Sequence, residues 1–176
     1  MKLRKQIEPQ FDIAENLYPE VLKLILDYTS CCDENGDEEF IEYKNLEEKL
    51  HVLTGKDITQ FNLSEWWEED GAENLAFNIS LPDPKKVDDL TKEELYEIVK
   101  RRKSFDEFAE NDSNFISTFY VNTTYGNGYF EKFLEKNLKE YNYKLFQRNK
   151  DKKGNYFEYS IDEIVEILWN NGNICN

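Results

Sequence analysis

Apolar residues recur three or four positions apart in two segments near the N-terminus. The first pattern predicts a helix over about 11–29, with Pro19 inside it. The second runs from Phe40 to Leu53 and predicts a helix that Gly55 ends. The polar run Asp33–Asp37 separates them, so we expect an antiparallel pair of helices joined by a short loop.

Strand patterns appear farther along the chain. Apolar and polar residues alternate over 74–81 until Pro82, which predicts a half-buried strand, and 115–124 is rich in β-branched and aromatic residues. The segments 143–148 and 155–159 flank a polar stretch and predict a β-hairpin with a basic tip.

Capping signals place further helices around these strands. Thr91 and Glu94 form a capping box that begins a helix over about 92–103, and Ser160 with Glu163 begins another near the C-terminus. Apolar spacing also predicts a helix through 130–138, before the hairpin, and a short one over 62–70.

Together these elements predict an α+β fold. The N-terminal helical hairpin would pack with a small, mostly antiparallel sheet, and the chain would close with a helix, a β-hairpin and a helix. A length of 176 residues fits a single domain over 1–176. A sub-boundary, if the chain has one, is expected near 100–114, where the charge changes.

Composition narrows the class of protein. Hydrophobic residues make up 39% of the chain, which is enough to form a core and argues against disorder. No apolar run approaches the ~20 residues of a membrane helix, and the basic N-terminus lacks the apolar core of a signal peptide. The three cysteines, Cys31, Cys32 and Cys175, are typical of reduced thiols, so we expect a cytoplasmic protein.

The net charge is confined to one part of the sequence. Residues 1–99 contain 25 Asp and Glu against 10 Lys and Arg, whereas residues 100–176 contain 12 of each, so the first part carries the whole net charge of −15. A field concentrated at one end steers oppositely charged partners. We therefore expect a basic protein as the partner.

The loop after the first predicted helix resembles an EF-hand calcium loop. Asp33, Asn35 and Asp37 would take its first, third and fifth positions. However, Glu38 stands where the sixth position needs Gly, and Lys44 stands where the twelfth needs a bidentate carboxylate. We therefore expect a solvated acidic loop, and we expect no metal or other cofactor.

A second acidic segment, 65–70, contains two tryptophans. In one interpretation a Trp lies in the core and the acids are solvated; in the other, Trp66 is an exposed anchor surrounded by acids that meet Lys and Arg. The predicted partner-binding residues come from the two acidic segments: Asp33, Glu34, Asp37, Glu38, Glu39, Glu65, Trp66, Glu68, Glu69 and Asp70.

Basic clusters at 100–103 and 150–153 have two interpretations each. Either could touch phosphate, or the first could end a helix and the second could be a solvated hairpin tip. Because the net charge opposes nucleic acid, we expect no direct nucleic-acid contact; pairing with the acidic half in a homodimer stays open. His51 is the only histidine, which excludes a two-histidine metal site.

The sequence therefore favours an acidic, non-enzymatic protein that inhibits a basic partner. An immunity protein that neutralises a nuclease toxin, or a DNA-mimicking inhibitor of bacterial or phage type, fits this composition. The catalytic alternative is a small-molecule enzyme that uses carboxylates and a divalent metal. The third alternative is a regulatory scaffold domain of a larger assembly.

Overall fold

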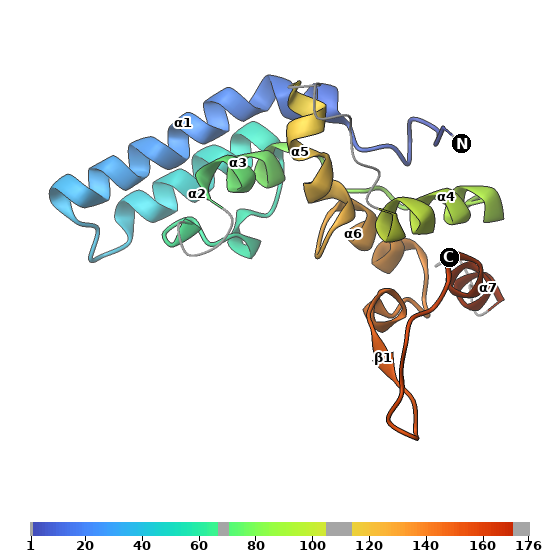
Figure 1. Cartoon of the computed structure of the whole chain (residues 1–176). Helices are drawn as coiled ribbons and strands as arrows, with labels where there is room; N and C mark the ends of the chain where they lie inside the picture. The colour runs from blue at the N-terminus through green and yellow to red at the C-terminus, as the bar shows by residue number, and fades with distance from the viewer. Residues whose placement is uncertain (1, 67–70, 105–113, 171–176) are drawn as a thin grey trace. The chain divides into compact units, whose positions relative to one another are not determined.

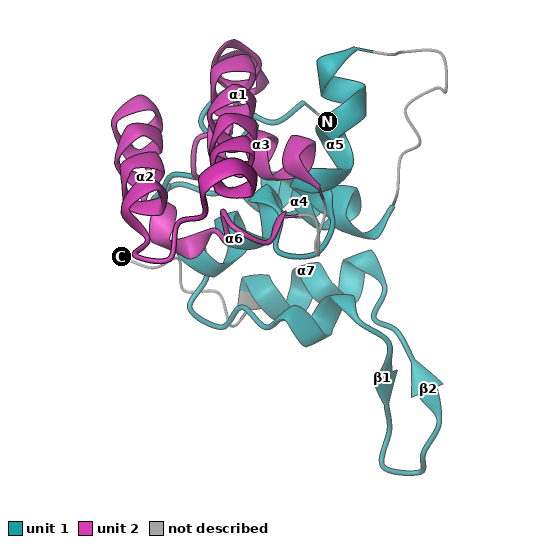
Figure 2. Ribbon diagram, turned by 90° about the vertical axis from the view of Figure 1, so that its left-hand side faces the viewer, with its two compact units in different colours: residues 1–9, 84–176 teal, residues 10–83 magenta. Residues whose placement is uncertain are grey.

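A computed structural model describes residues 2–66, 71–104 and 114–170. The chain divides into two compact units: unit 1 is residues 1–9 and 84–176, and unit 2 is residues 10–83 (Figure 2). The described residues are mostly helical, and their β structure is one two-stranded antiparallel hairpin in unit 1 (Figure 1). The predicted α+β class is therefore corrected to a mostly helical fold with a minor β component.

Unit 2 is built on the predicted pair of helices. The first, α1 (Phe11–Asn35), continues through Pro19 and ends at Gly36, and the second, α2 (Ile41–Thr54), ends at Gly55 as predicted. Gly55 adopts a left-handed φ of 71° and donates its N–H to the His51 carbonyl at 2.7 Å. A 3-10 turn, η1 (Ile58–Gln60), and a short helix, α3 (Ala72–Ser80), follow.

The core of unit 2 is formed where α1, α2 and α3 pack together. Its buried residues are Val21, Ile25, Leu46, Leu50, Ile58, Leu63, Ala72, Ala76 and Ile79. The helical pair thus packs with a third helix and not with the predicted sheet.

The strand predicted over 74–81 is wrong, because this segment forms α3. Ala72, Ala76 and Ile79 are buried at spacings of four and three residues, which is a helical stripe. The stripe begins at Ala72, outside the alternating segment, and α3 packs against α1. Packing against α1 therefore decides between the strand pattern and the helical stripe.

The β-rich segment 115–124 is likewise a helix, α5 (Phe115–Thr124), which corrects the second predicted strand. Asn114 and Ser117 form a capping box at its start. Inside it, the Thr118 hydroxyl donates to the Asn114 carbonyl at 3.0 Å and the Thr123 hydroxyl to the Tyr120 carbonyl at 2.6 Å. These bonds satisfy both threonine hydroxyls within the helix, so the β preference of threonine does not decide the structure of this segment.

Unit 1 contains the remaining elements. In it, α4 (Lys92–Lys103) packs on α7 (Ile161–Asn170), and α5 packs on α6 (Tyr129–Asn137). The capping box Thr91–Glu94 and the helix over 92–103 are confirmed. The core of unit 1 includes the buried residues Leu95, Ile98, Val99, Phe130, Phe133, Leu134, Ile164 and Leu168.

The predicted helix, β-hairpin and helix are confirmed in that order, but the hairpin is shorter than predicted. Residues 143–146 form a 3-10 turn, η3 (Tyr143–Phe146), and the ladder joins β1 (Asn149–Lys150) to β2 (Tyr156–Phe157). The Asp151 carboxylate closes the turn by accepting the N–H groups of Lys153 and Asn155, both at 2.8 Å.

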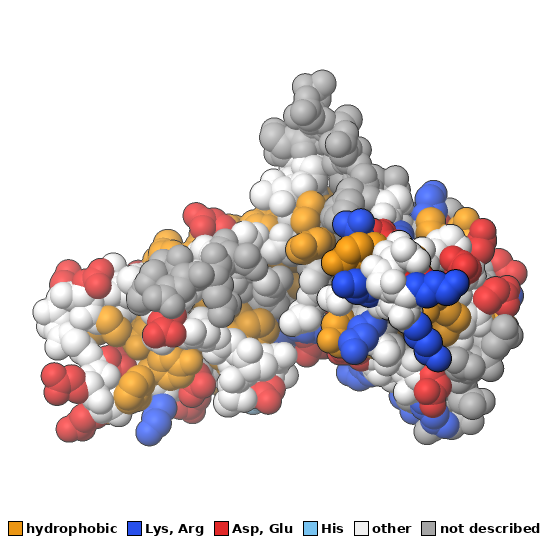
Figure 3. Space-filling model, turned by 60° about the horizontal axis from the view of Figure 1, so that its bottom comes forward, with side chains coloured by type: hydrophobic (Ala, Val, Ile, Leu, Met, Phe, Trp, Pro, Cys, Tyr) orange, Lys and Arg blue, Asp and Glu red, His pale blue; other side chains and the backbone are white. Residues whose placement is uncertain are grey.

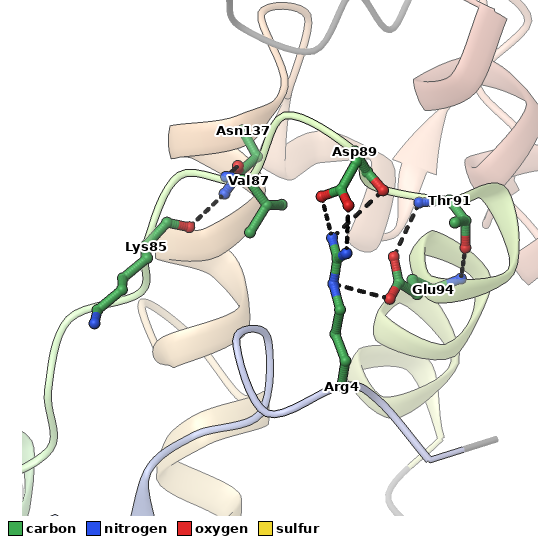
Figure 4. Close-up of polar contacts among 7 residues, drawn as sticks. All are labelled: Arg4, Lys85, Val87, Asp89, Thr91, Glu94 and Asn137. Atoms are coloured by element: carbon green, nitrogen blue, oxygen red, sulfur yellow. Dashed lines mark hydrogen bonds and ion pairs between the residues drawn. The ribbon is translucent and has the colours of Figure 1, made fainter.

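Two polar clusters attach loops to the body of unit 1 (Figure 4). The Arg4 guanidinium forms a bidentate pair with Asp89, with both N–O distances 2.7 Å, and its Nε lies 3.2 Å from Glu94. Asn137, which is fully buried, accepts the Val87 N–H at 2.7 Å and donates to the Lys85 carbonyl at 3.2 Å. These bonds fix the N-terminal segment and the 85–89 loop.

Two further predicted features, the helix over 62–70 and the sub-boundary near 100–114, lie only partly within the described residues. The short helix predicted over 62–70 is not formed by residues 62–65, and residues 67–70 lie outside the described residues. The sub-boundary predicted near 100–114 also falls partly outside them. The single-domain organisation over 1–176 stays a prediction.

Candidate protein-docking surface

The charge segregation coincides with the structural division of the chain. Unit 2 contains 19 Asp and Glu against four Lys and Arg, a net charge of −15, whereas unit 1 contains 18 of each. In Figure 3, acidic side chains border the part of the surface that carries α1 and α2, and basic side chains gather on unit 1. The candidate site is therefore sought on unit 2.

Five of the predicted partner-binding residues lie together at one end of the α1–α2 pair. We call this end, residues 33–40, the acidic tip. The side chains of Asp33, Glu34, Glu38 and Glu39 are exposed, and that of Asp37 is half-buried. The tip therefore presents four solvated carboxylates within eight residues.

Asp37 has a structural role in the tip. Its carboxylate accepts the backbone N–H groups of Ile41 at 2.8 Å, Glu42 at 3.1 Å and Tyr43 at 2.8 Å, and so caps α2. Burial acts to raise the pKa of Asp37, but hydrogen bonds from these three N–H groups and from the Tyr28 hydroxyl outweigh it and lower the pKa. Asp37 is thus held ionised by α2 itself.

This capping changes the interpretation of the EF-hand-like spacing. Asp33 and Asn35 belong to the last turn of α1, so 33–37 is not an open loop whose alternate residues surround an ion. The Asp37 oxygens face the N-terminus of α2. Among the described residues, no group of three or more His, Cys, Asp or Glu is arranged to hold a metal.

Phe40 is a candidate site residue that apolar spacing predicts inside a helix. It precedes α2, adopts left-handed φ and ψ values of 55° and 32°, and leaves 57% of its surface exposed. The next residue, Ile41, is 55% exposed. The tip therefore combines an apolar pair with surrounding carboxylates, the composition typical of an anchor in a protein interface. The sequence signal for this exposure is Asp37. Because Asp37 caps α2, the helix begins after Phe40.

The second acidic segment is described only in part. Glu65 is exposed, whereas Glu68, Glu69 and Asp70 lie outside the described residues. Trp66 is half-buried: its indole N–H donates to the Thr29 hydroxyl at 3.0 Å, and its ring packs against the core of unit 2. The anchor role of Trp66 stays a prediction. Phe40 is more exposed than Trp66 and is a second candidate for this role.

The basic cluster at 100–103 is engaged inside unit 1. Arg101 pairs with Glu8 at 2.8 Å and Glu97 at 3.0 Å, and Lys103 pairs with Glu158 at 3.3 Å. These ion pairs favour the structural interpretation of this cluster over the phosphate-binding one.

Arg102 lies at the centre of a polar cluster in unit 1. It contacts Glu131 at 2.6 Å and the Tyr141 hydroxyl at 2.7 Å, and its guanidinium carbon lies 4.2 Å from the centroid of the Phe146 ring. Burial raises the pKa of Tyr141, which keeps its hydroxyl protonated. Arg102 and Glu131 also line an open cavity of about 620 Å³. Because the charged groups bond to one another, the cluster has the chemistry of a structural ion pair.

No protein-family model, curated protein or solved structure matches this chain. None of the described helices combines the length and the apolar character that crossing a membrane requires.

Proposed function

We propose that this protein is an acidic inhibitor that binds a basic surface of another protein through unit 2. The observation that carries the proposal is the segregation of charge: unit 2 has a net charge of −15 and unit 1 has none. Such a field accelerates encounter with a basic partner and disfavours acidic ones. The acidic tip adds exposed apolar surface, through Phe40 and Ile41, to this field.

The class of partner follows from the chemistry of the surface. Carboxylates in solvent replace phosphates in a groove lined by Lys and Arg, so a nuclease or another nucleic-acid-binding protein is the expected target. An immunity protein that acts on a nuclease toxin in the cytoplasm, or a DNA-mimicking inhibitor, has this chemistry.

The test is capture of the partner by the immobilised full chain from a lysate of the organism that encodes it. A tip variant replaces Asp33 with Asn and Glu34, Glu38 and Glu39 with Gln, and it keeps Asp37 because Asp37 caps α2. A control variant removes the same number of charges from unit 1, at the exposed residues Asp88, Glu93, Glu135 and Glu140.

The proposal expects a basic protein that the wild type and the control retain and the tip variant loses. Binding should weaken as salt is raised above about 0.1 M, where screening is within about 10 Å, and duplex DNA should compete. Equal retention by the tip variant and the wild type, or a partner whose binding is indifferent to salt, would overturn the proposal.

A further inference from the structure

Helices α1 and α2 leave an open groove on unit 2. Its volume is about 640 Å³, and its lining residues are Glu20, Leu24, Asn45, Glu48, Lys49, Val52 and Leu53. Leu24 and Leu53 are half-buried, and Val52 is 78% exposed. Figure 3 shows hydrophobic side chains exposed among acidic ones on the part of unit 2 that carries these helices.

The groove uses residues other than those that form the core. Val21 and Ile25 of α1 and Leu46 and Leu50 of α2 pack in the core with α3, whereas the groove is lined by their neighbours on the helix surface. The pair thus has one apolar face covered by α3 and a second strip, open to solvent, on which Leu24, Val52 and Leu53 lie among four polar residues.

The strip continues toward the acidic tip. Ile41, Asn45, Glu48 and Val52 are spaced by four, three and four residues, so they form one stripe along α2. At 1.5 Å per residue, these positions span about 16 Å, or about three helical turns. Ile41, at the tip end of the stripe, is itself 55% exposed.

We propose that this groove binds a basic amphipathic helix of the partner; the inference rests on the proposed function and names the element that unit 2 recognises. Apolar side chains spaced three and four residues apart would lie on Leu24, Val52 and Leu53, as in helix-in-groove recognition. Lys and Arg side chains flanking them would meet Glu20 and Glu48 on opposite sides of the groove. A small molecule would leave most of this long, open strip uncovered.

Lys49 restricts the charges that the bound helix can carry next to it. It lies on α2 beside Glu48 and also lines the groove. Because like charges in contact repel, the partner helix should present a neutral or acidic residue at Lys49 and place its basic residues toward Glu20 and Glu48.

The test uses two fluorescein-labelled peptides of Leu and Lys with the same composition. One places Leu at helical spacing, and the other has the same residues in shuffled order. Binding to the full chain is measured by fluorescence anisotropy. Val52→Asn removes an apolar side chain from the groove without changing the net charge, and Val121→Asn, at a 54% exposed position of unit 1, is the matched control. Because Val52 is so exposed, the variant is expected to fold, and circular dichroism checks this.

The expected result is at least tenfold tighter binding of the helical peptide than of the shuffled one. Val52→Asn should weaken binding of the helical peptide about tenfold and Val121→Asn should leave it unchanged, because the apolar contact of Val52 is lost. Equal binding of the two peptides, or indifference to Val52→Asn, would overturn the inference. So would a dimer in sedimentation that Val52→Asn dissociates, because the groove would then bind a second copy.

The natural partner separates this inference from the proposed function. If the tip variant loses the partner and Val52→Asn retains it, the proposed function stands and the groove is wrong. If both variants retain it, both proposals are wrong.

Discussion

The Asp37 carboxylate accepts the backbone N–H of Tyr43, with 2.8 Å between Oδ2 and the nitrogen. The residue in the N-cap position of α2, Phe40, makes no side-chain cap, so an aspartate three positions earlier satisfies the helix N-terminus instead. The acidic tip thus contains one carboxylate bound to the helix and four that are solvated. Within this cluster, Asp37 stabilises the fold, whereas the four solvated carboxylates are the ones proposed to bind the partner.

We predict that Asp37→Ala lowers the melting temperature by several degrees, because three N–H groups at the start of α2 lose their acceptor. The pKa of Asp37 is lowered in the folded chain, so its stabilising contribution is present above the unfolded pKa of about 3.9 and is lost as pH falls through the folded value. Thermal unfolding from pH 7 to pH 2 checks this. The gap between the melting temperatures of the wild type and the variant should narrow as the pH falls; a constant gap would contradict the assignment.

A second prediction concerns Asn137, which is fully buried in unit 1. Its side chain bonds the Val87 N–H and the carbonyls of Lys85 and Phe133. Asn137→Ala leaves the buried Val87 N–H without its acceptor and should cost about 1–3 kcal/mol in the free energy of unfolding. Urea unfolding measures the loss, and hydrogen exchange should show faster exchange at Val87. Replacement of Asn127, which lies in an exposed turn, is the control.

A third prediction concerns the ion pair of Arg102 and Glu131, whose side chains are only 7% and 8% exposed. Removing either partner alone leaves an uncompensated buried charge and should cost about 3–5 kcal/mol. Replacing both, as in Arg102→Met with Glu131→Leu, should cost less than the sum of the two single changes. A double-mutant cycle in urea measures the coupling. Additive losses would show that the two charges do not stabilise each other.

The elements that the sequence predicts correctly carry local signals. The helix over 92–103 begins at a complete capping box, and the helix through 41–54 ends at a glycine that adopts a left-handed conformation. Such signals depend on hydrogen bonds between residues close in sequence, so they can be recognised without knowledge of the fold.

The two wrong strands depend on information that lies outside their segments. Residues 74–81 alternate like a strand, but all except the last belong to α3. This helix packs against α1 and buries Ala76 and Ile79. The candidate site shows the same limit: the run of acids at 33–39 is visible in the sequence, whereas the exposure of Phe40 depends on where α2 begins. The groove could not be predicted either, because it requires the relative placement of two helices.

The last prediction separates the binding role of Phe40 from its structural role. Phe40→Gly removes the ring and relieves a left-handed conformation that costs a non-glycine residue about 1 kcal/mol, while the added backbone entropy of glycine opposes folding by a similar amount. The free energy of unfolding should therefore change by less than about 1 kcal/mol. Affinity for the captured partner should fall at least tenfold, because an exposed aromatic anchor is lost.

Two companion variants make this prediction specific to the ring at that position. Phe40→Tyr keeps the ring and should retain most of the affinity. Tyr125→Gly removes a ring that is 67% exposed in unit 1, and it should leave the affinity unchanged. Titration of each variant by calorimetry gives the comparison. If Phe40→Gly binds as tightly as the wild type, the carboxylates of the tip act without an apolar anchor, and the partner's surface needs basic groups but no pocket for an aromatic ring.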